Sequence, residues 1–231
     1  MSDRRKMIPA PRHIVLAAVA GVIAGAVAVY VSSTLPGNNA STPQLATDTS
    51  ADASAEDKVC AAKADIAKAV GAAATGQVAA MMPADPPQSL KKLAFNDPEG
   101  KPMTVADHSG RTLLINLWAT WCAPCRAEMP ALDALEREMG SENFEVVAVN
   151  VDTGDDTKPK NFLDEIGITS LGYYRDNTLA VFNDLKKRGL ALGLPVTLLV
   201  DGEGCLLANM NGPAEWASPD AKKLIEAALA K

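Results

Sequence analysis

Histidine, cysteine and clusters of basic residues are all scarce in this sequence of 231 residues. There are only two histidines, His13 and His108, and a lone histidine is rarely a metal ligand, so we expect no histidine metal site. The net charge is −6 and the first thirteen residues carry +3, so the rest of the chain carries −9. An acidic body lacks the clustered Lys and Arg that bind nucleic acid. We therefore expect no nucleic-acid partner.

Long apolar runs are also rare, but one dominates the N-terminal end. Residues 14–31 form an uncharged run of eighteen residues, and about 17–25 apolar residues span a bilayer as a helix. Basic residues precede the run and none follows until Lys58, so the positive-inside rule predicts a cytoplasmic N-terminus. The run is longer than the apolar core of a cleaved signal peptide and lacks a clear cleavage site. We favour an uncleaved signal anchor in a bacterial inner membrane, with a cleaved signal peptide as the alternative.

The chain divides into predicted segments that differ in composition. Ser, Thr, Asn, Pro and Asp dominate the third segment, which predicts a flexible linker. The fourth is helical from Ser54, and the last alternates apolar strands with amphipathic helices, which predicts an α/β domain with a mixed sheet. Residues 1–13 are a predicted cytoplasmic basic arm, residues 14–31 a transmembrane signal anchor and residues 32–53 a flexible periplasmic linker. Residues 54–87 are a predicted N-terminal helical extension, and residues 88–231 are the α/β domain.

The strongest chemical signal is the stretch LLINLWATWCAPCRAEMP at residues 113–130. An apolar run to Trp118 predicts a buried strand, Cys122 and Cys125 follow with two residues between them, and a charged, helix-favouring stretch begins at Arg126. A thiol at a helix N-terminus meets free backbone N–H groups and the positive end of the helix dipole. Both lower the pKa of the thiol. Because two thiols at this spacing can also form a disulfide, the pair is predicted to be a redox switch.

The other readings of the cysteines are structural. A zinc ribbon needs two paired ligand sets, whereas Cys60 and Cys205 each stand alone in the sequence. In an oxidising compartment, two lone cysteines are most simply a structural disulfide, here joining the N-terminal helix to a hairpin near the C-terminus. Two buried, unreacted thiols are the alternative.

Three nearby acids, Asp152, Asp155 and Asp156, lack the spacing of a calcium loop. They are therefore predicted to form a solvated loop.

Two phrases together resemble the thioredoxin fold: WCAPC after an apolar strand, and GLPVTLLVD some seventy residues later. The longer phrase NLWATWCAPCRAEMP, behind a DHSGR turn, is similar to the TlpA, ResA and CcmG group of membrane-anchored, exported thioredoxin-like reductases. The resemblance covers residues 88–231 and the anchor arrangement, and is greatest to the TlpA members. It implies a thioredoxin fold with a central mixed sheet flanked by helices, an added N-terminal helix and β-hairpin, behind one transmembrane helix.

The resemblance also implies roles for individual residues. Cys122 matches the attacking cysteine and Cys125 the resolving one, with Trp121 shielding the site and offering a docking face. Pro195 matches the cis-proline beside the pair, and Glu128 matches the acid that the group uses near its cysteines.

One position departs from ordinary thioredoxin. Its buried acid is replaced here by Asn116. An amide cannot take a proton from the resolving thiol. This substitution moves the predicted proton acceptor to Glu128.

The implied function is reduction of disulfides in periplasmic proteins of cytochrome or cytochrome oxidase assembly, by dithiol–disulfide exchange. A membrane electron donor would restore the reduced pair, no cofactor is expected, and the catalytic domain is expected to be monomeric. Two alternatives use the same cysteines: a dithiol oxidase, and a copper-binding chaperone in which the thiolates are soft ligands.

Overall fold

The computed structural model describes residues 48–230, with side chains from residue 55 onward. The predicted basic arm and signal anchor and most of the predicted linker lie outside these residues. Within the described part of the chain, no helix combines the length and the apolar character needed to cross a membrane.

Helices and strands alternate through most of the described chain. In chain order they are α2 (Asp48–Ala61), α3 (Ala64–Ala73), η1 (Gly76–Val78), β1 (Met82–Pro83), β2 (Ala94–Asn96), β3 (Pro102–Thr104), η2 (Val105–His108), β4 (Thr112–Trp118), α4 (Ala123–Met139), β5 (Phe144–Asn150), α5 (Thr157–Glu165), β6 (Tyr174–Arg175), α6 (Ala180–Lys187), β7 (Val196–Val200), β8 (Leu206–Asn211) and α7 (Pro219–Leu229).

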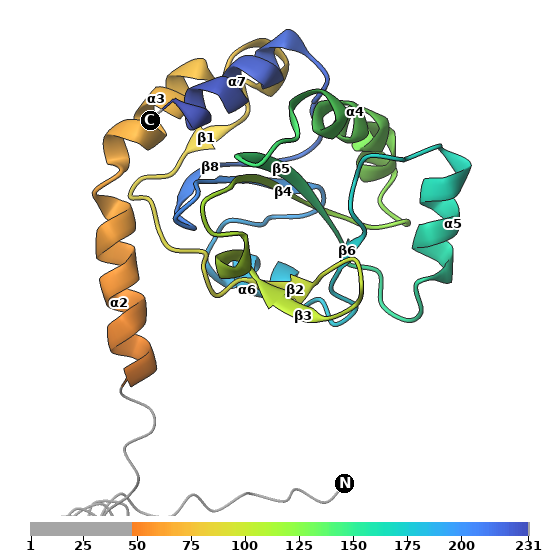
Figure 1. Ribbon diagram of the computed structural model, residues 1–231, viewed down its shortest axis with the longest axis horizontal. Helices are drawn as coiled ribbons and strands as arrows, with labels where there is room; N and C mark the ends of the chain where they lie inside the picture. Colours follow the sequence, from red (N-terminus) through yellow and green to blue (C-terminus); the bar gives the residue numbers. More distant parts are fainter. Residues whose placement is uncertain (1–47, 231) are drawn as a thin grey trace, which may run out of the picture. The chain divides into compact units, whose positions relative to one another are not determined.

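One mixed sheet of eight strands organises residues 48–230, in the order β1-β8-β7-β4-β5-β6-β2-β3. The central strand β4 runs parallel to β5 and antiparallel to β7. All seven residues of β4 are buried, because α4 and α7 lie on one side of the central strands and α6 on the other (Figure 1). The predicted mixed sheet with flanking helices is confirmed.

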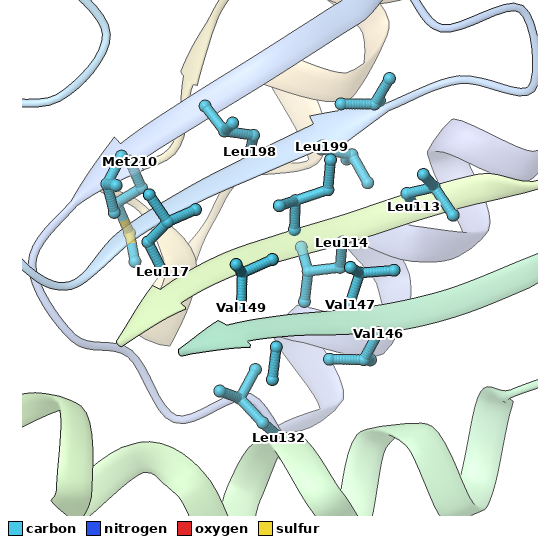
Figure 2. Packing of buried hydrophobic residues seen from close by; sticks show 14 of the residues in the cluster. Leu113, Leu114, Leu117, Leu132, Val146, Val147, Val149, Leu198, Leu199 and Met210 are labelled. Atoms are coloured by element: carbon cyan, nitrogen blue, oxygen red, sulfur yellow. The ribbon is translucent and has the colours of Figure 1, made fainter. Parts of the chain in front are cut away.

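The core forms where the central strands meet α4. Strands buried on both faces are apolar at nearly every position rather than at alternate ones, which explains the runs of Leu, Ile and Val in β4, β5 and β7. Figure 2 shows Leu132 of α4 beneath the strands, near Val146 of β5. Burying such a side chain contributes roughly 1.5–3 kcal/mol. Packing therefore holds α4 against β5 and so fixes where that helix begins.

The N-terminal extension differs from the prediction. Helix α2 begins at Asp48 rather than Ser54, so residues 48–53 are helical rather than linker, in keeping with the high helix propensity of the alanines in this segment. The helix is then interrupted around Lys63, before α3 begins. This break changes which face of the helix is buried: Val59 and Ile66 are exposed, whereas Cys60, Ala67 and Val70 are buried.

Regular structure continues through the proline-rich segment near position 83. Met82 and Pro83 form the short edge strand β1, which pairs with β8. A β-hairpin is present, formed by β2 and β3, which pair antiparallel.

A disulfide joins Cys60, in the last turn of α2, to Cys205, just before β8. The two Cα atoms are 5.2 Å apart and both side chains are buried. Beside it, Lys63 Nζ lies 2.5 Å from a carboxylate oxygen of Asp201 and 3.0 Å from one of Glu203. The extension is thus attached covalently and by ion pairs to the β7–β8 turn, and the predicted pairing of these cysteines is confirmed.

Removing this bridge should destabilise the domain. The chain between Cys60 and Cys205 is long, and losing a long cross-link costs roughly 2–5 kcal/mol. We expect a loss of this size in the free energy of unfolding for Cys60→Ser/Cys205→Ser, measured by urea unfolding of the full chain without reductant. The matched control is Cys122→Ser/Cys125→Ser, which removes a disulfide between cysteines only 3 positions apart. Its loss in the free energy of unfolding should be much smaller. Equal losses for both pairs would contradict the stabilising role.

Candidate redox site

Cys122 and Cys125 lie where β4 gives way to α4. They form a disulfide with Cα atoms 5.3 Å apart. Cys122 is the N-cap of α4, and its Sγ accepts a hydrogen bond from the backbone N–H of Cys125 at 3.3 Å. Cys122 is 6% exposed and Cys125 is fully buried. The helix N-terminus therefore favours negative charge on the sulfur of Cys122, which is also the one that solvent or a partner can reach.

The turn before Cys122 is held by Asp152, which was predicted to lie in a solvated loop. Asp152 is buried, and its carboxylate accepts hydrogen bonds from the backbone N–H and the hydroxyl of Thr120, both at 2.8 Å. Asn150 donates a third, also at 2.8 Å. The prediction for Asp152 was wrong, although Asp155 is exposed as expected. This anchored turn presents Trp121 with its side chain 64% exposed.

Pro195 lies at the same edge of the sheet. Its peptide bond with Leu194 is cis, as the resemblance implied. The next residue, Val196, begins β7 and pairs with Leu117 near the end of β4. Because β7 runs antiparallel to β4, its first residues meet the last residues of β4, after which the cysteines follow.

Glu128 lies one helical turn after Cys125, on the buried face of α4. Its Oε1 accepts a hydrogen bond from Asn116 Nδ2 at 2.8 Å. Its Oε2 accepts two, from the backbone N–H of Ala214 and from Trp216 Nε1, both at 3.1 Å. Burial raises the pKa of Glu128 from 4.5 to about 7, while the hydrogen bonds from these three groups oppose the rise. The carboxyl group can therefore gain or lose a proton near neutral pH.

Sequence reasoning singled out Asn116 as a departure from thioredoxin but missed its contacts. Its Nδ2 also donates to Thr197 Oγ1 of β7 at 3.0 Å, and its Oδ1 has no hydrogen-bond partner among the described residues. Trp216 was missed altogether, and it is fully buried. A buried indole usually needs an acceptor for its N–H. A tryptophan outside the predicted strands was therefore the one sequence signal that could have pointed to a buried acceptor such as Glu128.

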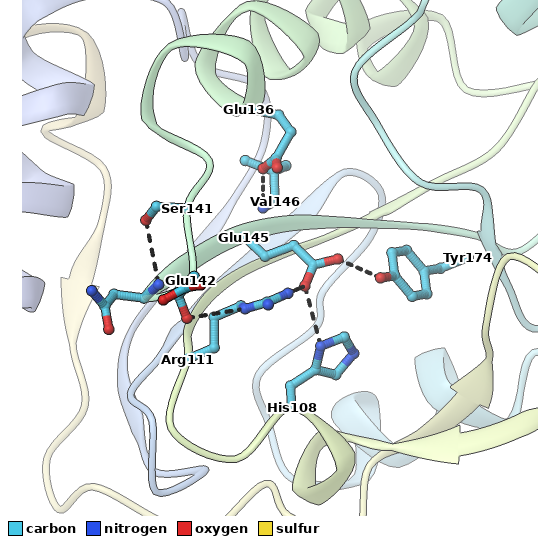
Figure 3. Close-up of polar contacts among 9 residues, drawn as sticks. His108, Arg111, Glu136, Ser141, Glu142, Glu145, Val146 and Tyr174 are labelled. Atoms are coloured by element: carbon cyan, nitrogen blue, oxygen red, sulfur yellow. Dashed lines mark hydrogen bonds and ion pairs between the residues drawn. The ribbon is translucent and has the colours of Figure 1, made fainter.

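A half-buried carboxylate, that of Glu145, lies at the opposite end of the central strands, near the start of β5. Figure 3 shows Glu145 surrounded by Arg111, His108 and Tyr174. Arg111 lies 2.5 Å and His108 3.3 Å from the carboxylate, and Tyr174 donates a hydrogen bond to it. Burial raises the pKa of Glu145, but the hydrogen bonds from His108, Tyr174 and Arg111 outweigh burial and lower it to about 2. This group is a fixed anion that joins β5 to its neighbours, and His108 belongs to it rather than to a metal site.

Among the side chains that the structure describes, from residue 55 to residue 230, no three His, Cys, Asp or Glu gather in a way that could hold a metal ion. The chemistry of the site described above rests on the two sulfurs, one exchangeable proton on Glu128 and the groups that position them.

A family model described as Redoxin matches residues 83–225. The chain belongs to the Redoxin family. It is 39% identical over 116 residues to the thiol:disulfide interchange protein HelX of Rhodobacter capsulatus. The aligned stretch covers 48% of this chain and 59% of HelX. It is 35% identical over 86 residues to the thiol-disulfide oxidoreductase ResA of Oceanobacillus iheyensis. The aligned stretch covers 37% of this chain and 44% of ResA. The predicted resemblance to the TlpA, ResA and CcmG group is confirmed.

Among solved structures, a thiol:disulfide interchange protein of the thioredoxin family from Chlorobium tepidum superposes with a TM-score of 0.50 at 26% identity. The match covers 62% of this chain and 97% of that protein. The predicted thioredoxin fold is confirmed for the Redoxin domain. This chain spans less than two thirds of the length of HelX and of ResA.

The pKa of Glu128 predicts a pH-dependent stability. Between pH 4.5 and about 7, the folded protein keeps a proton on Glu128 that the unfolded chain has lost. The stability that this group contributes is therefore full below pH 4.5 and falls as the pH rises through about 7. We expect the free energy of unfolding of the wild type, relative to Glu128→Gln, to fall by roughly 3 kcal/mol across this window.

The measurement is urea unfolding of both oxidised proteins at several pH values between about 4 and about 8. Glu128→Gln is the matched control, because an amide of nearly the same shape does not titrate. Two stability curves that run parallel across this range would contradict the raised pKa.

Proposed function

We propose that this protein is a thiol–disulfide oxidoreductase that reduces disulfides in partner proteins through Cys122 and Cys125. One observation carries the proposal: the pair forms a disulfide at the N-terminus of α4, with Cys122 as the helix cap and Cys125 buried beneath it. A purely structural bridge gains nothing from a helix N-terminus, whereas a reversible one uses it to stabilise the thiolate. The names of HelX and ResA describe the same chemistry.

The reaction begins with the reduced pair. The Cys122 thiolate attacks one sulfur of a partner disulfide, and the other partner sulfur leaves as a thiolate. Cys125 then gives its proton to Glu128, and the resulting thiolate attacks Sγ of Cys122. The Cys122–Cys125 disulfide forms, the second partner sulfur leaves as a thiolate, and the partner has gained two electrons. Its two thiolates then take up two protons, one returned by Glu128 and one from solvent. Glu128 suits its step because its pKa of about 7 lets it accept and return a proton near neutral pH.

The exposed apolar side chains at this edge support a protein substrate. Trp121 is 64% exposed, and Leu192, in the loop before Pro195, is 82% exposed. Large apolar side chains left in solvent beside a reactive group are typical of a binding surface. The partner would therefore dock between the turn that carries Trp121 and the loop that carries Pro195.

The cellular setting of the proposal comes from the sequence. The apolar run at residues 14–31 supports a single-pass anchor in a bacterial inner membrane, with the catalytic domain in the periplasm. Resemblance to the TlpA, ResA and CcmG group supports substrates in cytochrome or cytochrome oxidase assembly and a membrane electron donor.

Trapping tests the exchange reaction. In the full chain with Cys125→Ser, Cys122 should attack a disulfide peptide and stay bound to it, because the resolving thiol is missing. We expect a one-to-one covalent adduct by mass spectrometry that dithiothreitol reverses, and in cells a discrete set of mixed disulfides with periplasmic proteins. The matched control, Cys122→Ser/Cys125→Ser, should give neither. Adducts that persist in the control, or none in either protein, would sink the proposal.

The direction of electron flow has its own test. A reductase should have a reduction potential near that of thioredoxin, about −270 mV, whereas an oxidase lies near DsbA, about −120 mV. We expect the Cys122–Cys125 couple of the full chain to titrate near the thioredoxin value in a glutathione or dithiothreitol redox buffer, with alkylation of Cys122 as the readout. A value near that of DsbA would reverse the direction and leave the exchange chemistry intact.

A further inference from the structure

Trp216 is buried, lies far from the cysteines in the sequence and is absent from the mechanism above, yet it contacts the group proposed to move the proton. Its indole N–H donates to Oε2 of Glu128, 88 residues earlier in the chain. The loop that carries Trp216 follows β8 and also supplies the backbone N–H of Ala214 to the same oxygen. A single loop therefore holds one oxygen of the carboxyl group with two donors.

The two oxygens of Glu128 differ in what their partners can become. An indole N–H and a backbone N–H are donors only, so Oε2 is always held as an acceptor. Oε1 is held by the side-chain amide of Asn116, which has both a donor and an acceptor end. The acceptor end, Oδ1, has no partner among the described residues. Rotation of this amide would turn Oδ1 toward a proton on Oε1.

We propose that Trp216 is a positioning residue for the redox reaction: its indole N–H fixes Oε2 of Glu128 as an acceptor, which leaves Oε1 to take the proton that Cys125 gives up. The proton moves from the sulfur of Cys125 to Oε1, directly or through one water, and no electrons move in this step. The amide of Asn116 follows by rotating from donor to acceptor. This inference rests on the proposed function, because it concerns the resolving step of disulfide exchange.

The neighbours of Glu128 favour such a role because none of them carries a charge. Asn116 faces it from β4, Ala214 and Trp216 from the loop before α7, and Thr197 of β7 lies behind Asn116. On its own helix, Cys125 lies one turn earlier and is the proposed proton donor once the disulfide is reduced. Burial raises the pKa of Glu128, and only hydrogen bonds from three neutral donors oppose that rise. Trp216 is one of these three donors.

The test follows the resolving step with Ellman's reagent and the reduced full chain. Attack by Cys122 releases one thionitrobenzoate, and attack by Cys125 on the resulting mixed disulfide releases the second. Trp216→Phe removes a donor that stabilises the carboxylate, so the pH at which the second phase reaches half its maximal rate should rise by about one unit. The first phase should keep its rate and pH dependence. Glu128→Gln should remove the Glu128-dependent part of the pH profile in the second phase.

The chain offers a matched control in Trp118→Phe. Trp118 is also a buried tryptophan, but its indole N–H has no hydrogen-bond partner among the described residues. The substitution loses the same ring volume and no hydrogen bond, so the second phase should keep its wild-type midpoint. If Trp216→Phe does not fold, a benzothiophene analogue of tryptophan at position 216 keeps the ring shape without the N–H and should give the same upward shift.

The outcomes separate this inference from the proposed function. If the wild type releases the second thionitrobenzoate but Trp216→Phe has the midpoint of Trp118→Phe, Trp216 has no positioning role and the exchange reaction stands. If Glu128→Gln keeps the wild-type profile, Glu128 is not the acceptor and the inference fails with it. If the wild type never releases the second thionitrobenzoate, the proposed function itself fails.

Discussion

The register of β4 between β5 and β7 determines where every part of the redox site lies. β4 is buried along its whole length and ends at Trp118, where the chain turns to start α4. Because β5 is parallel to β4, it ends at the same edge, and Asp152 just beyond it reaches Thr120. Because β7 is antiparallel, it begins at this edge, so Pro195 and Thr197 lie there as well. A slip of one residue in either pairing would turn Asn116 to the other face of the sheet and away from Glu128.

Glu128, which is buried, and Glu145, which is half-buried, show how surroundings give one residue type two behaviours. Glu145 is held by Arg111 and His108, and its pKa is lowered to about 2. Glu128 has only neutral donors, and burial raises its pKa to about 7. A nearby cation stabilises the anion strongly enough to outweigh the cost of burial, whereas neutral hydrogen bonds offset that cost only in part. Glu145 is therefore suited to holding strands together, and Glu128 to moving a proton.

The features that could be predicted from the sequence were those encoded over a short stretch. The apolar run of β4 and the Cys122–Cys125 spacing each lie within a few residues, and the structure contains both. The pairing of Cys60 with Cys205 spans 145 residues, yet it could be predicted because only two cysteines remained and the predicted compartment favours disulfides.

Features that depend on long-range packing could not be predicted in this way. The break at Lys63 places that residue against the β7–β8 turn, which sequence periodicity cannot show. The sequence around Asp152 does not distinguish it from its exposed neighbour Asp155. Only the parallel pairing of β5 with β4 brings Asp152 to Thr120. The contact of Trp216 with Glu128 depends on the path of a loop after the last strand, which no local pattern specifies.

The amide at position 116 follows from the same electrostatics. Asn116 Nδ2 lies 2.8 Å from Oε1 of Glu128, and two buried carboxylates at such a distance cannot both be ionised. An acid at this position would have to share one proton with Glu128, and the pair would titrate together rather than as one group. An apolar residue would leave Oε1 without a donor and raise the cost of ionising Glu128 further. An amide avoids both effects, because it donates to the ionised carboxylate and can accept from the protonated one. Of the three kinds of residue, only the amide leaves Glu128 a single, independent proton site without adding to the cost of ionising it.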